Sequence, residues 1–144
     1  MENRFKFRIW DGENMIHESV RRKDKSEYGY AIDLSGILLS WDDTDYYPSV
    51  GDAEEEKEPG KFKIMQCTGL KDENGKEIYE GDILEIEVNI LIVKWSMGEF
   101  FLKNMTHADN NLPIIDAGCG IILGNIYENL ELLKSNQVNN AKNS

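Results

Sequence analysis

Few residues of this chain have the types and spacing that chemistry requires. The only histidines are His17 and His107, and His107 has a carboxylate near it in the run His107-Ala108-Asp109. Such a run could supply two metal ligands, or a base with a carboxylate that orients it. No third residue follows at a spacing typical of a metal site or a catalytic triad, so we interpret these side chains as loop residues.

The two cysteines form no reactive pattern. Cys67 and Cys119 are far apart and make no Cys-x-x-Cys pair, which argues against a zinc ribbon or a disulfide framework and fits reduced thiols in a cytosol. Cys67 stands among apolar strand residues, whereas a nucleophile needs a lowered pKa and an adjacent base, so we expect a small core residue. Gly118-Cys119-Gly120 lacks the further glycines and the Lys-Ser/Thr of a phosphate loop and predicts a bulge or turn.

Three acids, Glu77, Glu80 and Asp82, are close enough in sequence to suggest a carboxylate pair for acid–base catalysis or cation binding. Gly81 lies between the last two, and this favours a turn whose acids accept bonds from local N–H groups. We therefore predict no catalytic residue, no cofactor and no metal, and we do not expect an enzyme.

The elements that must position these residues are short β-strands. Phe5, Phe7 and Ile9 recur at every second position of 5–10, which predicts a half-buried strand with these three residues on one face. Asp11-Gly12 could turn this strand back onto 15–19 as a hairpin. In 61–68, Met65 and Cys67 share one face and are expected in the core. Further strands are predicted at 28–34 and 37–41 around Ser35-Gly36, at 82–95 with a break at Asn89, at 99–103 after a turn at 96–98, and at 114–115 and 121–123.

Two local signals are more specific. Asn74-Gly75 is the residue pair that a type I′ hairpin needs, because both central residues must take positive φ. In 125–133 the period changes, since Ile126, Leu130 and Leu133 share one helical face and Asn125 or Asn129 could cap the N-terminus. We predict a short C-terminal helix, followed by a disordered tail over 136–144.

Charge is concentrated in one segment. Of the chain's formal net charge of −11, most is due to the stretch 42–60, which has eight acids against the single Lys57. A like-charge run with turn formers is most simply a solvated, mobile loop. It could instead dock a basic partner or imitate the phosphates of nucleic acid. Direct nucleic-acid binding is disfavoured, because the largest basic cluster, 21–25, is short and interrupted.

The sequence gives no sign of a membrane segment, since it lacks both the apolar run of a signal peptide and the roughly 18 consecutive apolar residues of a membrane span.

The best candidate for partner binding is a set of aromatic and acidic residues in and beside the acidic segment. Aromatic side chains on β-structures often bind peptides or bases, whereas Trp95 is expected in the core. The candidate residues are Trp41, Tyr46, Tyr47, Glu54, Glu55 and Glu56.

Four motifs together resemble the YopX family of bacteriophage and prophage proteins. They are Lys-Phe-Arg-Ile-Trp-Asp at 6–11, the run 66–83 that contains Thr-Gly-Leu-Lys-Asp-Glu-Asn-Gly-Lys, Val-Lys-Trp at 93–95 and Gly-Asn-Ile-Tyr-Glu-Asn at 124–129. The resemblance implies a phage protein with an SH3-like barrel over 61–135, a cytoplasmic location and possible self-association as a homo-oligomer. It implies no established activity. One departure is Leu130, where the family pattern has a proline that would preset the first helical turn.

We therefore expect a mainly β protein with an N-terminal β region over 1–60, the barrel region over 61–135 and the tail. The favoured function is a non-enzymatic protein-binding or assembly module whose partner is an unidentified host or phage protein. One alternative is an acidic decoy that occupies the nucleic-acid site of a host protein. Another is an unrecognised enzyme with a pocket lined by residues such as His107, Asp109 or Asp82.

Overall fold

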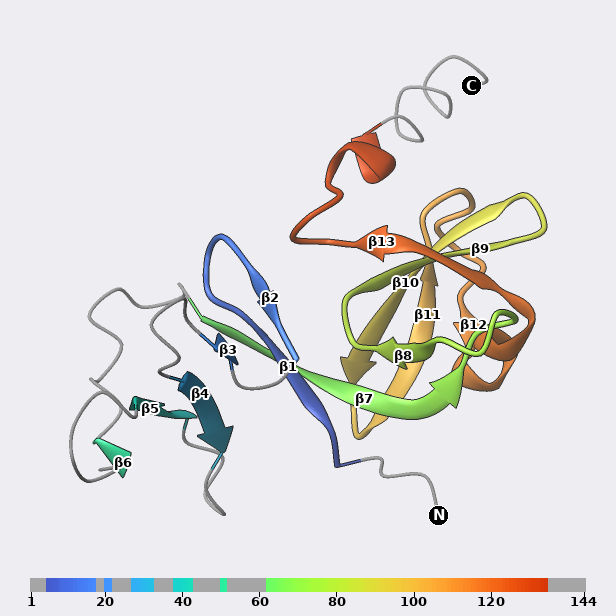
Figure 1. Ribbon diagram of the computed structural model, residues 1–144. Coiled ribbons are helices and arrows are strands. Elements are labelled where there is room, and N and C mark those ends of the chain that lie inside the picture. Colours follow the sequence, from blue (N-terminus) through green and yellow to red (C-terminus); the bar gives the residue numbers. More distant parts are fainter. Residues whose placement is uncertain are drawn as a thin grey trace. The chain divides into compact units, whose positions relative to one another are not determined.

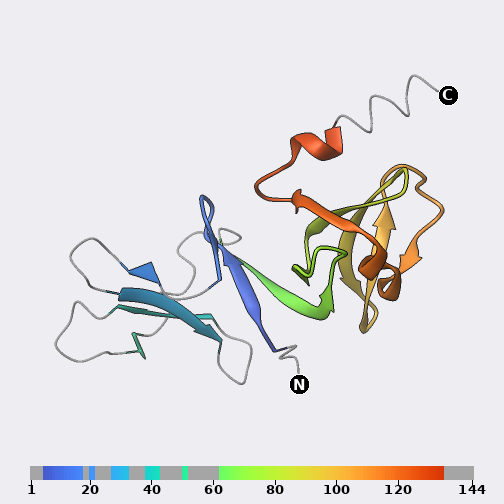
Figure 2. The ribbon, with the colours of Figure 1, turned by 45° about the vertical axis from the view of Figure 1, so that its right-hand side comes forward.

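The structure is a computed structural model that describes residues 5–17, 20–21, 27–32, 38–42, 50–51 and 62–134 (Figure 1). The described residues are mainly β, as the sequence predicts, because most of their regular structure consists of short strands (Figure 2). The chain divides into two compact units, one made of Met1–Phe7 with Met65–Ser144 and the other of Arg8–Ile64.

The 8–64 unit contains two small antiparallel groups of strands. β1 pairs with β2, with Ile9 opposite Ile16, and the Asp11 carboxylate accepts the Asn14 N–H at 2.8 Å in the connecting turn. A second sheet has the order β3-β4-β5-β6, and the pairing of β4 with β5 confirms the two strands predicted around Ser35-Gly36. The strands are β1 Phe7–Trp10, β2 Met15–Ile16, β3 Val20–Arg21, β4 Glu27–Ile32, β5 Leu38–Asp42 and β6 Val50–Gly51.

One expectation for the first strand is wrong. Alternation predicted Phe5, Phe7 and Ile9 on one buried face, yet Phe5 is 68% exposed and Phe7 37% exposed. Arg8 and Ile9 are both buried instead. A strand whose two faces are both covered does not show simple alternation of polar and apolar residues, and a long arginine stem can be buried along apolar surface.

The other unit is built on a curled five-stranded sheet of order β12-β11-β10-β9-β13 (Figure 1). β7 lies beside this unit's N-terminal residues, since the Cys67 N–H donates to the Lys6 carbonyl at 2.8 Å, and β7 also pairs with β8. The elements are β7 Lys63–Lys71, β8 Glu77–Tyr79, β9 Asp82–Ile86, β10 Asn89–Ser96, β11 Glu99–Asn104, β12 Leu112–Pro113, the 3-10 helix η1 Ile114–Cys119 and β13 Ile121–Asn125.

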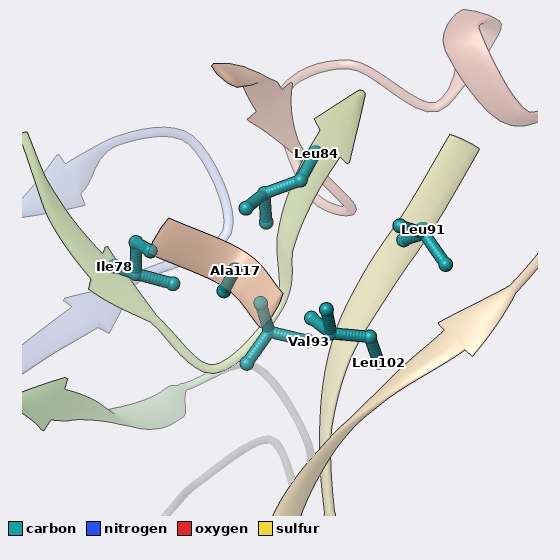
Figure 3. Packing of buried hydrophobic residues seen from close by; sticks show 6 residues of the cluster. All are labelled: Ile78, Leu84, Leu91, Val93, Leu102 and Ala117. Carbon is teal, nitrogen blue, oxygen red and sulfur yellow. The ribbon is translucent and has the colours of Figure 1, made fainter. Parts of the chain in front are cut away.

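The core of this unit fills the inside of the curled sheet. Leu84 lies opposite Leu91, and Val93 opposite Leu102, so their side chains share one face (Figure 3). Ile78 of β8 and Ala117 of η1 complete the cluster, and all six residues are fully buried. Each large aliphatic side chain buried in this way contributes about 1.5–3 kcal/mol. Packing of these side chains therefore contributes much of the stability of this unit.

The central strands are buried on their other face as well. Ile83 and Ile92 are opposite each other and alternate with the core residues, yet both are nearly inaccessible. Met65 and Cys67 of β7 are each 2% exposed, which confirms them as core residues. This burial on two faces explains why 82–95 reads as an almost continuous apolar run.

The turn predicted at Asn74-Gly75 has a different geometry. Only Gly75 has positive φ there, at 81°, and the pairing of Lys71 with Glu77 leaves five residues in the loop. A type I′ turn is a two-residue connection with positive φ at both positions. That geometry occurs at Met97 and Gly98, with φ of 53° and 85°, where Ser96 pairs with Glu99.

Three other boundaries differ from the sequence-based expectation. The β9–β10 break is the turn Glu87-Val88, where Glu87 has φ of 55°, and Asn89 already begins β10. Residues 114–115 belong to η1 instead of a strand, and η1 also includes Gly118 and Cys119. Within 125–134, the α-helix is confined to 131–134, because 126–128 form a turn whose N–H groups at Tyr127 and Glu128 donate to the Asn125 side chain. The tail predicted over 136–144 lies outside the described residues.

Candidate functional site

The residues predicted to bind a partner fall mostly outside the described part of the chain. The backbone of Trp41 lies in β5, paired with Gly29 and Val50. Tyr46, Tyr47, Glu54, Glu55 and Glu56 are not among the described residues. The patch of aromatic and acidic residues therefore stays a prediction.

Cys67 has the environment of a core residue. Its side chain is 2% exposed, and burial raises the pKa of the thiol, while the Gly69 N–H, 3.5 Å from the sulfur, opposes this only partly. A raised pKa disfavours the thiolate, which is the nucleophilic form. The structure thus agrees with the interpretation of Cys67 as a packing residue, whereas Cys119 at the end of η1 is exposed.

The three acids near Gly81 make separate contacts, and the one of Glu77 is with a residue far away in the sequence. The Glu77 carboxylate pairs with the Lys6 ammonium at 2.7 Å, and the buried Asp82 carboxylate accepts the Tyr79 N–H at 2.8 Å. Burial raises the pKa of Glu80, and the Gln66 N–H and Lys94 offset this only in part. Asp82 therefore has the turn role that its sequence context indicates, and among the described residues no group of three His, Cys, Asp or Glu side chains could hold a metal ion.

His107 belongs to a network of amides that shapes the loop after β11. Its Nδ1 lies 3.0 Å from Asn89 Oδ1, which also accepts a bond from Asn104 Nδ2. Asn104 is almost fully buried, and its Oδ1 accepts the N–H groups of Thr106 and His107. Asn89 Oδ1 can only accept, so this contact is a hydrogen bond when the ring carries a proton on Nδ1, and that inference follows from the amide orientation. The ring is thus oriented by an amide instead of a carboxylate.

The Asp72 carboxylate accepts three backbone hydrogen bonds from two parts of the chain. Its Oδ1 accepts the N–H groups of Asn74 and Lys76, and its Oδ2 accepts the Ile122 N–H at 3.0 Å. Burial by itself would raise the pKa of Asp72, but these three donors, Ile122 first, outweigh it and hold the pKa below the usual value for aspartate. Asp72 links the β7–β8 loop to β13, and its role is structural.

The surface that sequence reasoning missed is the turn end of the β10–β11 hairpin. We define the β10–β11 tip as Trp95, Met97 and Phe100. Trp95 was expected in the core but is 50% exposed, and its ring packs edge-on against Phe100 at a centroid distance of 4.7 Å. Met97 is 99% exposed in the turn. Trp95 pairs with Phe100 two residue pairs beyond the last core pair, Val93 and Leu102, so the same face of the hairpin continues past the core into solvent.

An isolated exposed apolar residue is common on protein surfaces, but a group of large apolar side chains on one turn is a usual mark of a contact surface. One sequence signal could have revealed the β10–β11 tip. Only two residues separate Ser96 from Glu99, and Met97 is one of them, so it lies in the turn. Among the described residues, no helix is both long and apolar enough to cross a membrane.

Comparison with known proteins identifies relatives of most of the chain. The sequence model of a family described as YopX protein matches residues 6–134. A crystal structure of protein EF1440 from Enterococcus faecalis shares 26% identity with a TM-score of 0.53, covering 89% of this chain and 96% of that one. A crystal structure of protein yopX from Bacillus subtilis shares 21% identity with a TM-score of 0.57, covering 91% and 97%. No curated protein matches the sequence.

Proposed function

The chain belongs to the YopX family, and from this premise we propose that it is a non-enzymatic protein-binding or assembly module of a phage or prophage that works in the cytoplasm. The proposal includes an SH3-like barrel in the unit formed by 1–7 and 65–144, supported by its curled sheet and by the 3-10 helix before β13. It also includes self-association, which the family resemblance implies.

The way that the described ionisable groups are used supports a binding role. Asp72 and Asp82 each accept backbone N–H groups in turns, and Cys67 is buried with a raised pKa. These are arrangements that stabilise a fold. Catalytic groups need a geometry in which a nucleophile, a base and a stabilising donor face one reacting atom. No observation on the described residues favours the alternative of an enzyme that uses His107, Asp109 or Asp82.

The observation that carries the proposal is the β10–β11 tip. A half-exposed tryptophan that is braced by an edge-on phenylalanine and followed by a fully exposed methionine presents rigid and adaptable apolar groups side by side. Tryptophan is enriched among the residues that dominate binding energies, and methionine adapts to irregular partners. We propose that this tip is one contact surface of the module and that the segment 41–60, with Trp41, Tyr46, Tyr47, Glu54, Glu55 and Glu56, is the other.

Photo-crosslinking from defined positions tests the proposal. A photoreactive amino acid at position 97 is expected to form a discrete adduct in cells that express the protein, and Trp95→Ser in the same chain should remove it. Val88 is a matched control, since it is also a highly exposed apolar residue in a hairpin turn. Equal adducts from positions 88 and 97, or none from position 97, would contradict a binding tip. Light scattering after size exclusion reports whether the adduct contains a second copy.

A second candidate function is the acidic decoy, which the eight acids in 42–60 favour. Removing 42–58 should then abolish the capture of a nucleic-acid-binding protein, and the capture by the intact chain should weaken steeply with salt. Capture that is insensitive to both changes would count against the decoy without affecting the tip.

A further inference from the structure

The tip of the β7–β8 loop combines an asparagine with a glycine in an exposed position. Asn74 and Gly75 are both exposed, and a Cβ built on Gly75 would meet nothing within 4 Å. Glycine leaves its own backbone nitrogen sterically accessible to the preceding side chain. No other part of the protein therefore covers the Cβ position of Gly75 in the folded state.

The reaction that this pair can undergo needs only water. The backbone nitrogen of Gly75 attacks the side-chain carbonyl carbon of Asn74, a carbon–nitrogen bond forms, the bond from that carbon to Nδ2 breaks, and ammonia leaves with the proton of the Gly75 nitrogen. Water then adds to one of the two carbonyl carbons of the cyclic imide and opens it to aspartate or isoaspartate. No electrons are exchanged, so no oxidant or reductant is required.

The structure also shows what restrains this reaction. The Gly75 N–H donates to the Asp72 carbonyl at 2.9 Å, so the attacking nitrogen is engaged. The Asp72 carboxylate accepts the N–H groups of Asn74 at 3.0 Å and Lys76 at 2.9 Å and so fixes the residues on both sides. The loop has to open before Gly75 can reach the Asn74 side chain. We propose that Asn74-Gly75 is a hydrolytic modification site whose rate is set by the opening of the loop that Asp72 holds.

Opening of this loop is coupled to β13. Asp72 Oδ2 accepts the Ile122 N–H, and the Glu73 N–H donates to the Gly120 carbonyl at 2.9 Å. Once isoaspartate forms, the backbone between Asp72 and Lys76 is longer by one methylene. The N–H groups of the loop then no longer match the positions of the Asp72 carboxylate oxygens. Either product also adds a negative charge beside Asp72 and Glu73. The modification thus converts a closed loop into an open one.

Time-resolved peptide mapping of the purified full-length chain at mildly alkaline pH tests the proposal. Mass spectrometry should find aspartate and isoaspartate at position 74, forming at least about tenfold more slowly than in a synthetic peptide of residues 70–78, because a hydrogen-bonded loop is open only part of the time. Asp72→Asn should bring the rate in the full chain closer to that of the peptide. In Asn74→Gln the aspartate and isoaspartate products should disappear from the mapped peptide, which identifies that peptide as the one that reports on position 74.

Asn110, which is also exposed in a loop but precedes Asn111, provides the internal reference. Its rate should not respond to Asp72→Asn. A rate at Asn74 equal to that of the peptide, or no product at position 74, overturns the proposal without the need for any variant. Equal rates at Asn74 in the wild type and in a folded Asp72→Asn protein overturn the role given to Asp72.

Discussion

The side chain of Asp72 accepts a 3.0 Å hydrogen bond from the backbone N–H of Ile122, fifty positions further along the chain. The same carboxylate fixes its own loop through Asn74 and Lys76. A single buried acid therefore joins the β7–β8 loop to the edge strand of the curled sheet. Bonds to a charged acceptor are about twice as strong as neutral ones, so a change at Asp72 should weaken both the loop and its attachment to β13.

Asp72→Asn should lower the free energy of unfolding at neutral pH by about 1–3 kcal/mol, because an amide replaces a charged acceptor of three N–H groups. The pKa of Asp72 is lowered in the folded state. Its contribution is therefore fully present above the unfolded value of about 3.9 and is lost as the pH falls below that value towards the folded pKa. Urea unfolding at neutral pH and near pH 3 measures both effects.

The difference between wild type and Asp72→Asn should shrink at the acidic pH. Asp109→Asn in the exposed loop after β11 is the control, and it should change stability little at either pH. A difference that stays constant with pH would show that the charge of Asp72 contributes nothing.

Met97→Asn should stabilise the protein by about 0.4–1 kcal/mol. Met97 has φ of 53° and is followed by Gly98 in a type I′ turn, a geometry that asparagine adopts more readily than methionine. Met97→Val, with a branched Cβ at positive φ, should destabilise it. Thermal unfolding ranks the three proteins, and a Met97→Asn protein less stable than wild type would mean that methionine makes contacts that compensate for its φ. Met97→Asn removes the exposed methionine without weakening the turn, so a loss of partner binding in this variant would come from the β10–β11 tip and not from unfolding.

Gly124→Ala should cost about 1–3 kcal/mol, since the added methyl group would overlap the Asn129 side chain, whose oxygen accepts the Asn125 N–H. Gly118→Ala is the matched control, because the nearest atom there is the Lys71 carbonyl at 3.8 Å, an ordinary contact. Denaturant unfolding should place Gly118→Ala within about 0.5 kcal/mol of wild type. Adding Asn129→Ala to Gly124→Ala should recover part of the loss, and strict additivity would argue against the overlap.

The two thiols should react at very different rates in the native protein. Cys119 is exposed, whereas Cys67 is buried and has a raised pKa, so its thiolate stays scarce until the pH exceeds the usual range for cysteine. Alkylation at neutral pH followed by peptide mapping should label Cys119 first and Cys67 only after denaturant is added. Labelling of both at similar rates without denaturant would place Cys67 at the surface.

The sequence predicted the elements better than their connections. Asn74-Gly75 has the composition of a type I′ turn, but the type depends on how many residues the paired strands leave between them, and Asp72 closes a longer loop. Met97-Gly98 adopts the type I′ geometry without the usual asparagine, because the β10–β11 register leaves only two residues to reverse the chain. Register is a property of two strands and their faces, which a local motif does not contain.

The candidate site shows the same limit. Tryptophan is usually buried, so Trp95 was assigned to the core. Its pair with Phe100 lies two residue pairs beyond Val93 and Leu102, which are fully buried, and Trp95 is half exposed. Where a core ends depends on which elements cover the sheet, and η1 and β8 are distant from β10 in sequence. Cys67 and Asp82, in contrast, were interpreted correctly because their neighbours in sequence already determine their surroundings.

By itself, the sequence determined the family, the mainly β class and the use of Met65 and Cys67 as core residues, because these follow from motif order and from side-chain period along a single strand. The tertiary structure alone decided which carboxylate links distant strands, which turn takes the two positive φ values and which aromatic faces solvent. Those outcomes depend on contacts between residues far apart in the chain, such as Asp72 with Ile122, and no local pattern records such contacts.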